Sequence, residues 1–330
     1  MANKKNNKNK FNINDLIVIG AGAAGLSAAI YAGRYLMKTV VFSKEFGGET
    51  ATAGKIWNYP GFKSIDGYEL VKKMKDQAES LGAKIINSEV IKIKKKNYCF
   101  FVTASDKKEY VANSVILAVG AERRKLGLPN EKELTGRGVH YCVTCDGPLF
   151  SGKTVGMVGG GDSSVKGVNL LGQYVKKIYL IVREKEIMAE PINYKQMKRL
   201  GSQVEVLLET EVKKLFGRKK LEKIVLSKAR SGKKELKLDG LFIEIGAVPD
   251  VELAQSLGVQ LDDHGYIKTD NLMKTNVDGV FAAGDTVNLF GRFKQDITAA
   301  AMGAVAATSA YEDYKEHGEL CYLHMKPTEK

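Results

Sequence analysis

Two of the four cysteines of the chain, Cys142 and Cys145, have only two residues between them, and Asp146 follows directly. A C-x-x-C pair can close a small disulfide that forms and breaks readily, since a lowered thiol pKa favours thiolate–disulfide exchange. A neighbouring carboxyl group can give the proton that a leaving thiolate needs. The same two sulfurs could instead form half of a zinc site or a structural cross-link. The rest of the chain decides among these three readings.

A zinc site would need two further ligands at a comparable spacing. Cys99 lies within the apolar run "YCFFVTA", Cys321 lies near the end of the sequence, and the four histidines form no H-x(3–5)-H pair. Only His140 is close to the cysteine pair in sequence. We therefore expect no metal here and interpret Cys142 and Cys145 as a redox pair.

The composition excludes several classes of protein. No apolar run in the 330 residues approaches the ~20 that a transmembrane helix needs, and the N-terminus "MANKKNNKNKFNIND" lacks the apolar core of a signal peptide. We therefore expect a cytoplasmic protein that does not bind membranes. In that compartment a close cysteine pair is more often catalytic than permanently bonded.

The formal net charge of +13 raises the question of a nucleic-acid partner. The lysines, however, are interleaved with acidic residues in segments such as "EVKKLFGRKKLEK", without aromatic side chains on which bases could stack. We therefore expect no nucleic acid as a partner. A basic face can still attract an acidic protein.

The order of the predicted elements indicates an α/β protein with a repeated unit. After a Lys/Asn-rich tail, residues 1–13, which we expect to be disordered, "DLIVIG", "AGAAGLSAAIYAGRYL" and "TVVFS" read as strand, helix and strand. The segment "KTVGMVGGGDSSVKGVNLLGQYVKKIYLIVREKE" repeats this pattern about 140 residues later. Between them we predict a loop over "GGETATAGKIWNYPGF", a helix over "GYELVKKMKDQAESLG" and an antiparallel meander. A strand in "GVFAAGDT" and an Ala-rich helix from "DITAAA" onward complete the chain.

The first glycine turn fits G-x-G-x-x-G between a strand and a helix. Gly20 allows the tight turn, Gly22 lets the backbone approach a pyrophosphate, and Gly25 lets the helix pack against the strand. The N–H groups and the positive end of the helix dipole then face the phosphates. Glu45, twenty residues after Gly25, is a candidate for the adenosine ribose hydroxyls.

The second turn keeps Gly159 and Gly161 but has Ser164 where a third small residue is usual. The following strand ends in Arg183 and Glu184. An acid at this place suits a free ribose diol, whereas arginines suit a 2′-phosphate. Two dinucleotide turns in one chain suggest one bound flavin and a second nucleotide that carries hydride to it.

The segment "GVHYCVTCDGPLF" followed by "KTVGMVGGGDSSV" resembles the low-molecular-weight thioredoxin reductases. The resemblance continues, in the family's order, through "GAGAAG", "GGETATAGKIWNYPGF", "ILAVGAERRKLGLPNE", "LFIEIGAVPD", "GVFAAGDT" and "KQDITAA". It implies a pyridine nucleotide-disulfide oxidoreductase fold of class II type with two Rossmann-like dinucleotide-binding domains. The FAD domain would be discontinuous, residues 14–123 and 249–330, with a nicotinamide-type domain at residues 124–248.

The resemblance also implies roles for individual residues. Cys145 would face the flavin, Cys142 would attack the disulfide of a thioredoxin-like partner, and Asp146 would be the general acid. The FAD-binding positions would be Gly20, Gly22, Ala23, Ala24, Ser43, Glu45, Gly48, Glu49, Asn58, Val90, Gly120, Gly284, Asp285, Lys294, Gln295, Asp296 and Ile297. The nicotinamide nucleotide would contact Gly159, Gly161, Asp162, Ser163, Arg183 and Glu184. Homodimers are the norm of the family.

One departure from the family pattern concerns the electron donor. The family's 2′-phosphate motif, H-R-R-x-x-x-R, is replaced here by Val182, Arg183, Glu184 and Met188, so one of its three arginines survives. Three alternatives follow: NADH bound through Glu184, weakly used NADPH, or a different donor such as reduced ferredoxin. We favour NADH because the glycine turn is largely kept. A redox-inert flavin-binding protein and a ferredoxin-NADP reductase-like enzyme are the remaining alternatives, and neither needs the C-x-x-C pair.

Overall fold

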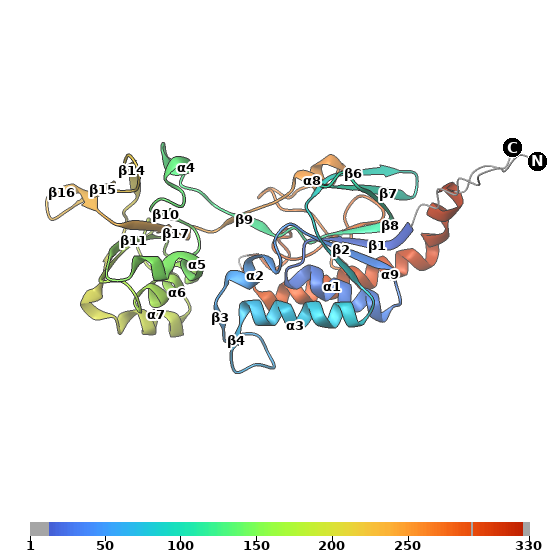
Figure 1. Cartoon of the computed structure of the whole chain (residues 1–330), viewed down its shortest axis with the longest axis horizontal. Helices are drawn as coiled ribbons and strands as arrows, with labels where there is room; N and C mark the ends of the chain where they lie inside the picture. The colour runs from blue at the N-terminus through green and yellow to red at the C-terminus, as the bar shows by residue number, and fades with distance from the viewer. Residues whose placement is uncertain (1–12, 292, 326–330) are drawn as a thin grey trace, which may run out of the picture. The chain divides into compact units, whose positions relative to one another are not determined.

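The computed structural model describes residues 13–291 and 293–325, and these form two compact units, each described here by itself (Figure 1). One unit comprises the described residues of 1–121 and 249–330, and the other comprises residues 122–248. The chain crosses between them in β9 (Ala121–Arg123) and β18 (Ala247–Pro249), which pair with each other as a two-stranded sheet. Most of the predicted tail lies outside the described residues. Its last residue, Ile13, instead begins the first strand and is buried. None of the helices described is long and apolar enough to cross a membrane.

The first unit is built on a parallel sheet in the order β5-β2-β1-β8, with β19 on the far side of β8. Its strands are β1 (Ile13–Ile19), β2 (Thr39–Ser43), β5 (Lys84–Asn87), β8 (Glu109–Leu117) and β19 (Val280–Ala282). β1 and β2 are buried along their whole length, which explains why their sequences are continuous apolar runs rather than alternating ones.

Three helices lie on one side of this sheet, and an antiparallel meander lies on the other (Figure 1). The helices are α1 (Ala23–Arg34), α3 (Gly67–Ser80) and α9 (Asp296–Met325), and the meander joins β6 (Val90–Lys96), β7 (Cys99–Ala104) and the start of β8. α1 can pack closely on α9 because Gly303 takes no side chain: a Cβ there would lie 2.0 Å from the carbonyl oxygen of Ala24. The small residues of the Ala-rich helix thus serve packing.

The predicted loop after β2 is more ordered than we expected. It contains a short helix, α2 (Gly48–Thr52), and a two-stranded sheet of β3 (Lys55–Ile56) and β4 (Ile65–Asp66). The side chain of Asp66 caps α3 by accepting a hydrogen bond of 3.0 Å from the backbone N–H of Tyr68. A further short helix, α8 (Glu252–Ser256), follows the second crossing. Sequence periodicity does not reveal elements of two to five residues.

The second unit repeats the parallel arrangement with the order β10-β17-β11-β12-β13. The strands are β10 (Val139–His140), β11 (Thr154–Val158), β12 (Lys177–Ile181), β13 (Val204–Leu207) and β17 (Gly240–Ile243). One apolar cluster packs α5 (Val143–Asp146), η1 (Gly147–Phe150), α6 (Asp162–Leu171) and α7 (Pro191–Lys198) on one face. A second cluster packs α4 (Glu131–Leu134), β14 (Val212–Phe216), β15 (Lys223–Arg230) and β16 (Lys233–Lys237) on the other. Both predicted Rossmann-type units are therefore present.

Candidate active site

The cysteine pair is disulfide-bonded and lies at the start of α5 in the second unit. Cys142 is the N-cap residue, and its Sγ accepts a hydrogen bond of 3.1 Å from the backbone N–H of Cys145. The backbone N–H of Asp146 donates to the carbonyl of Cys142 over 3.1 Å. The short helix therefore sets the sulfurs side by side, and it puts the carboxyl group of Asp146 on the residue after the second sulfur.

A buried histidine holds this carboxyl group. Nδ1 of His140 lies 2.8 Å from Oδ2 of Asp146, and the imidazole is only 7% exposed. The ring packs edge-on against Phe150, with ring centroids 5.1 Å apart, and also contacts Phe242, whose centroid lies 5.5 Å away. Since His140 is the last residue of β10, the sheet fixes the position of the imidazole.

The buried carboxylate of Glu131 anchors the residue before the pair. The hydroxyl of Tyr141 donates to Oε1 of Glu131 over 2.6 Å, and the two carboxylate oxygens also accept the backbone N–H groups of Leu126 and Leu128. Glu131 is 4% exposed. Burial and this hydrogen bond raise the pKa of the Tyr141 hydroxyl far above its ordinary value, so it remains a donor. The network ties the segment before Cys142 to α4.

The first glycine turn has the shape that a dinucleotide needs. Gly20 has φ +111°, and a Cβ there would lie 2.0 Å from the carbonyl oxygen of Ala118, so no other residue fits. A Cβ on Gly25 would lie 1.8 Å from the carbonyl oxygen of Gly20. A Cβ on Gly22, in contrast, would lie 3.8 Å from the nearest described atom, the carbonyl oxygen of Gly47. Gly22 is the N-cap of α1, which has neither a side-chain cap nor an acid in its first turn. The open N–H groups at this helix end fit a pyrophosphate.

Other predicted flavin positions gather around this turn. Gly48 lies against it, because a Cβ on Gly48 would be 3.8 Å from Cα of Gly22. Ser43, the last residue of β2, is 3% exposed, and its Oγ has no hydrogen-bond partner among the described residues. A hydroxyl of adenosine could supply this partner. Glu45 is exposed beyond the end of that strand. Both features fit a bound nucleoside.

Two hydrogen bonds connect the loop after β2 to the start of α9. The hydroxyl of Thr50 donates to Oδ1 of Asp296 over 2.5 Å, and the amide of Asn58 donates to Oε1 of Gln295 over 2.8 Å. Thus segments more than 230 residues apart in sequence meet here. Ile297 follows in the first turn of α9, half-buried.

Asp285 and Lys294 form the charged part of this region. Burial raises the pKa of the Asp285 carboxyl; Lys294 opposes the shift, and the negative charges of Asp296 and Glu49 add to it. Burial lowers the pKa of the Lys294 ammonium, while Asp285 opposes this change. Nζ of Lys294 donates to the carbonyl of Val287 and lies over the Tyr266 ring, 4.3 Å from its centroid. The carboxyl group of Asp285 is therefore partly buried and within electrostatic range of Lys294, Asp296 and Glu49.

The second glycine turn is similar in geometry. Gly159 has φ +133°, and a Cβ there would lie 2.1 Å from the carbonyl oxygen of Glu244, whereas a Cβ on Gly161 would meet nothing within 4 Å. Ser164 fits in the third small position because its hydroxyl donates back to the carbonyl of Gly161 over 2.7 Å. Its side chain is fully buried.

Asp162, the first residue of α6, ties the turn to the next segment. Its carboxylate accepts hydrogen bonds from Lys166, from the side chain of Asn193 and from the backbone of Glu190. Burial alone would raise the pKa of Asp162, but these three donors outweigh burial and lower it. Asp162 therefore remains ionised and holds α6 and α7 together. Ser163 follows it in the first turn of the helix.

Arg183 and Glu184, which follow β12, form an ion pair with each other. Nη2 of Arg183 lies 2.9 Å from Oε1 of Glu184, and the Arg183 side chain is 74% exposed. The other carboxylate oxygen of Glu184 would lie 3.7 Å from a Cβ on Gly160, so the acid stands beside the glycine turn. The region therefore presents a carboxylate where a 2′-phosphate would be repelled.

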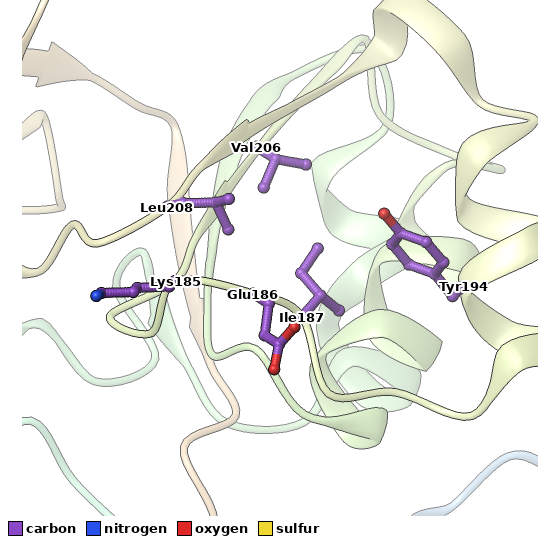
Figure 2. A pocket seen from close by; sticks show the side chains of 6 residues that line it. All are labelled: Lys185, Glu186, Ile187, Tyr194, Val206 and Leu208. Carbon is purple, nitrogen blue, oxygen red and sulfur yellow. The ribbon is translucent and has the colours of Figure 1, made fainter.

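A pocket of about 420 Å³ adjoins this pair (Figure 2). In the close-up, Val206 and Leu208 lie above Ile187, with the ring of Tyr194 at one side. The complete lining is Lys185, Glu186, Ile187, Tyr194, Val206 and Leu208. Apolar walls and one aromatic ring can hold a planar base.

The remaining predicted positions lie apart from these contacts or serve packing. Val90 is buried at the start of β6, Gly120 has φ +73° just before β9, and Gly284 has φ +83° and packs against Ala24. Ala23 begins α1 and is buried.

Several features of the structure are not predicted by the sequence patterns. They are the contact of His140 with Asp146, the Glu131 network, the pocket residues after β12, and a second disulfide between Cys99 and Cys321. Of these, only His140 leaves a signal in the sequence, because it lies two residues before Cys142.

The comparisons with known proteins agree with this geometry. The family model described as "Pyridine nucleotide-disulphide oxidoreductase" matches residues 14–306. The thioredoxin reductase of Treponema pallidum is 40% identical over 299 residues, which cover 90% of this chain and 95% of that one. A crystal structure of Lactococcus lactis thioredoxin reductase superposes with a TM-score of 0.86 at 33% identity, covering 92% of this chain and 99% of that one. A ferredoxin-flavin thioredoxin reductase from Clostridium acetobutylicum is 34% identical with a TM-score of 0.50, covering 92% and 99%.

Proposed function

Because the chain belongs to the pyridine nucleotide-disulphide oxidoreductase family, we propose that it is a flavoprotein disulfide reductase that reduces thioredoxin or a thioredoxin-like protein. The observation that carries this proposal is the bonded Cys142–Cys145 pair with Asp146 beside it, in a chain that also has two dinucleotide-shaped glycine turns. A flavin-binding protein without redox activity would need neither the pair nor the acid.

The first unit would hold FAD. The open helix end at Gly22 fits the pyrophosphate, the unpaired Oγ of Ser43 fits the adenosine, and the region of Asn58, Asp285 and Gln295 would meet the ribityl chain and ring. When bound, the flavin supplies the two-electron chemistry that opens the Cys142–Cys145 disulfide.

The cysteines and Asp146 would then act on the partner. The thiolate of Cys142 attacks one sulfur of the partner disulfide, a mixed disulfide forms, and the leaving thiolate takes a proton from Asp146. The thiol of Cys145 next gives its proton to the carboxylate of Asp146, and the resulting thiolate attacks Sγ of Cys142. The Cys142–Cys145 bond re-forms, and the second partner thiolate leaves and takes this proton. The partner gains two electrons and two protons, and the enzyme returns to the disulfide form.

The second unit would bind NADH. Glu184 beside the second glycine turn supports this choice, since a carboxylate can accept hydrogen bonds from both hydroxyls of an unphosphorylated ribose. The adjoining pocket, with Tyr194 at its side, suits the adenine. Arg183 would attract a 2′-phosphate but is already paired with Glu184, so NADPH would be used poorly.

A second candidate donor is a reduced ferredoxin. Support for it comes from the similarity to the ferredoxin-flavin thioredoxin reductase of Clostridium acetobutylicum and from the missing arginines. The basic chain would suit an acidic ferredoxin and an acidic thioredoxin equally. The positive charge therefore does not favour ferredoxin over a nicotinamide nucleotide as the donor.

Rapid mixing under anaerobic conditions tests the donor and the activity together. The oxidised full-length protein is mixed separately with NADH, NADPH and reduced ferredoxin, and the flavin absorbance is followed. We expect NADH to bleach the band fastest. Bleaching by ferredoxin alone would move the assignment to the second candidate. A protein that reduces no disulfide, even after its flavin is reduced with dithionite, would instead be a redox-inert flavin-binding protein.

We further propose that the enzyme works in the cytoplasm as a homodimer, as the family norm implies. Light scattering during size exclusion would test the dimer: a mass near 72 kDa, twice the 36.2 kDa of the chain, is expected, and a mass near 36.2 kDa would contradict it.

A further inference from the structure

We propose that His140 is a positioning residue for Asp146, holding the carboxyl group in the orientation from which it protonates the leaving thiolate of the partner. This inference rests on the proposed function and adds to it a residue that the sequence reasoning considered only as a zinc ligand. The observation is the 2.8 Å contact between Nδ1 of His140 and Oδ2 of Asp146.

Asp146 depends on His140 for its orientation. α5 has only four residues, and so short a helix has little rigidity of its own. In the described part of the chain, His140 is the only side chain that hydrogen-bonds the carboxyl group of Asp146. The Asp146 side chain is 33% exposed, so without this bond it would be free to turn toward solvent.

His140, in contrast, has little freedom. Its imidazole is 7% exposed, and it is wedged between the rings of Phe150 and Phe242. Its backbone pairs with Phe242 in the parallel sheet. The sheet and the aromatic contacts therefore fix Nδ1, and Nδ1 in turn fixes Oδ2 of Asp146.

The hydrogen bond can be kept throughout the proton transfer. With a proton on Oδ1, Asp146 still has Oδ2 as an acceptor for the Nδ1–H group. When the Oδ1–H bond breaks and the S–H bond of the partner thiol forms, the carboxylate left behind accepts the same hydrogen bond, now charge-assisted and stronger. His140 thus favours the state that follows proton transfer.

Two disulfide probes separate this role from a purely structural one. An oxidised thioredoxin releases an alkyl thiolate, which is more basic than an aryl thiolate and leaves more readily when it takes up a proton. The aryl disulfide 5,5′-dithiobis(2-nitrobenzoate) releases a stable thiolate of low pKa, which does not. Each full-length variant is reduced with dithionite under anaerobic conditions, and its maximal rate with each probe is measured. This procedure bypasses the identity of the natural donor.

We expect His140→Leu to lower the maximal rate with thioredoxin by about tenfold to hundredfold and to leave the rate with the aryl disulfide unchanged. His317→Leu is the matched control, because Nδ1 of His317 forms a similar contact of 3.2 Å with Oδ1 of Asp313 on the exposed surface of α9. It should change neither rate. An equal loss with both probes, or no loss with thioredoxin, would overturn the inference while leaving the proposed function intact.

A second pair of variants covers the case in which His140→Leu does not fold. His140→Asn places an amide donor where Nδ1 was, whereas His140→Gln places it where Nε2 was. We expect Asn to retain the thioredoxin rate and Gln to lose it, and equal rates would overturn the inference. Wild-type protein that reduces neither probe would refute the proposed function itself.

Discussion

Cys99 in β7 and Cys321 in α9 are joined by a disulfide although 222 residues separate them in sequence. Their Cα atoms lie 5.1 Å apart, and both side chains are buried in a small apolar cluster with Ile13 and Val111. The bond ties the C-terminal helix to the antiparallel meander of the first unit. It lies outside the unit that carries Cys142 and Cys145.

We expect this cross-link to stabilise the protein without taking part in turnover. The double variant Cys99→Ala/Cys321→Ala should lose about 2–4 kcal/mol of unfolding free energy, because a cross-link over a long loop restricts the unfolded chain. Urea unfolding measures the loss. Wild-type protein reduced with dithiothreitol lacks the cross-link but keeps both cysteine side chains, so it separates the effect of the cross-link from the effect of the smaller alanine side chains. Thioredoxin reduction should be unchanged. An unchanged urea midpoint, or two reactive thiols in denatured Cys142→Ser/Cys145→Ser protein, would contradict this account.

We expect the glycine turn at Gly22 to bind only FAD and the glycine turn at Gly161 to bind only the nicotinamide nucleotide. The methyl group of Gly22→Ala would lie 3.8 Å from the nearest described atom, and that of Gly161→Ala would have no described atom within 4 Å. Both variants should therefore fold, with a loss of unfolding free energy of about 1 kcal/mol or less. Gly22→Ala should release FAD, because the methyl group would occupy the space of the pyrophosphate. Gly161→Ala should keep FAD but bind the nicotinamide nucleotide at least tenfold more weakly.

Flavin absorbance of the purified variants and titration with NADH check the two cofactors separately. Gly20→Ala is the contrasting control: its Cβ would lie 2.0 Å from the carbonyl oxygen of Ala118, and the first unit should misfold. A fully flavin-loaded Gly22→Ala protein would show that this turn does not bind FAD.

The two glycine turns are the part of the site that can best be predicted from the sequence. A glycine with a positive φ, such as Gly20 or Gly159, is a local backbone requirement, and it leaves a readable pattern between strand and helix. The C-x-x-C pair with Asp146 is equally local. The two Rossmann-type units could therefore be predicted from the sequence alone.

Contacts that depend on how the chain folds back on itself leave no such pattern. Cys99 and Cys321 meet only because α9 returns to the meander, and Tyr141 meets Glu131 only because α4 folds back on β10. His140 lies six residues before Asp146, but their contact depends on the turn after β10 and on aromatic packing from η1 and β17. α2 was missed because a helix of five residues has no measurable period.

Glu184 should determine preference for NADH over NADPH. Glu184→Ala removes the carboxylate that would accept the ribose hydroxyls, and a lost hydrogen bond to a charged group costs about 1.5–3 kcal/mol, equivalent to a rise in the KM for NADH of roughly tenfold to hundredfold. The KM for NADPH should stay constant or fall, because repulsion of the 2′-phosphate is relieved. Steady-state kinetics with both nucleotides check this, with Glu235→Ala, at an exposed acid of β16 in the same unit, as the control. Equal changes for both nucleotides would exclude ribose recognition by Glu184.

The buried carboxyl of Asp285 should make the stability of the flavin-free protein depend on pH. Burial raises its pKa in the folded state above the ordinary 3.8, so its contribution to stability is complete below pH 3.8 and is lost as the pH rises through the folded-state pKa. At pH 7 the ionised carboxylate therefore disfavours the folded state. Asp285→Asn should then be more stable than wild type at pH 7, with the difference shrinking toward pH 4. Urea unfolding of both proteins between these pH values measures it, and a variant less stable at pH 7 would contradict this reading.

The central claim is that electrons leave this flavoprotein through Cys142 and Cys145. The most direct test reduces the full-length protein with dithionite under anaerobic conditions, mixes it with oxidised thioredoxin, and counts the thioredoxin thiols formed. The reduced wild-type protein carries two electrons on the flavin and two on the cysteine pair, so it should produce four thiols for each flavin oxidised, whereas Cys142→Ser and Cys145→Ser should retain FAD and release no fully reduced thioredoxin. Turnover at the wild-type rate in either variant, or a colourless protein that does not bind FAD, would contradict the account.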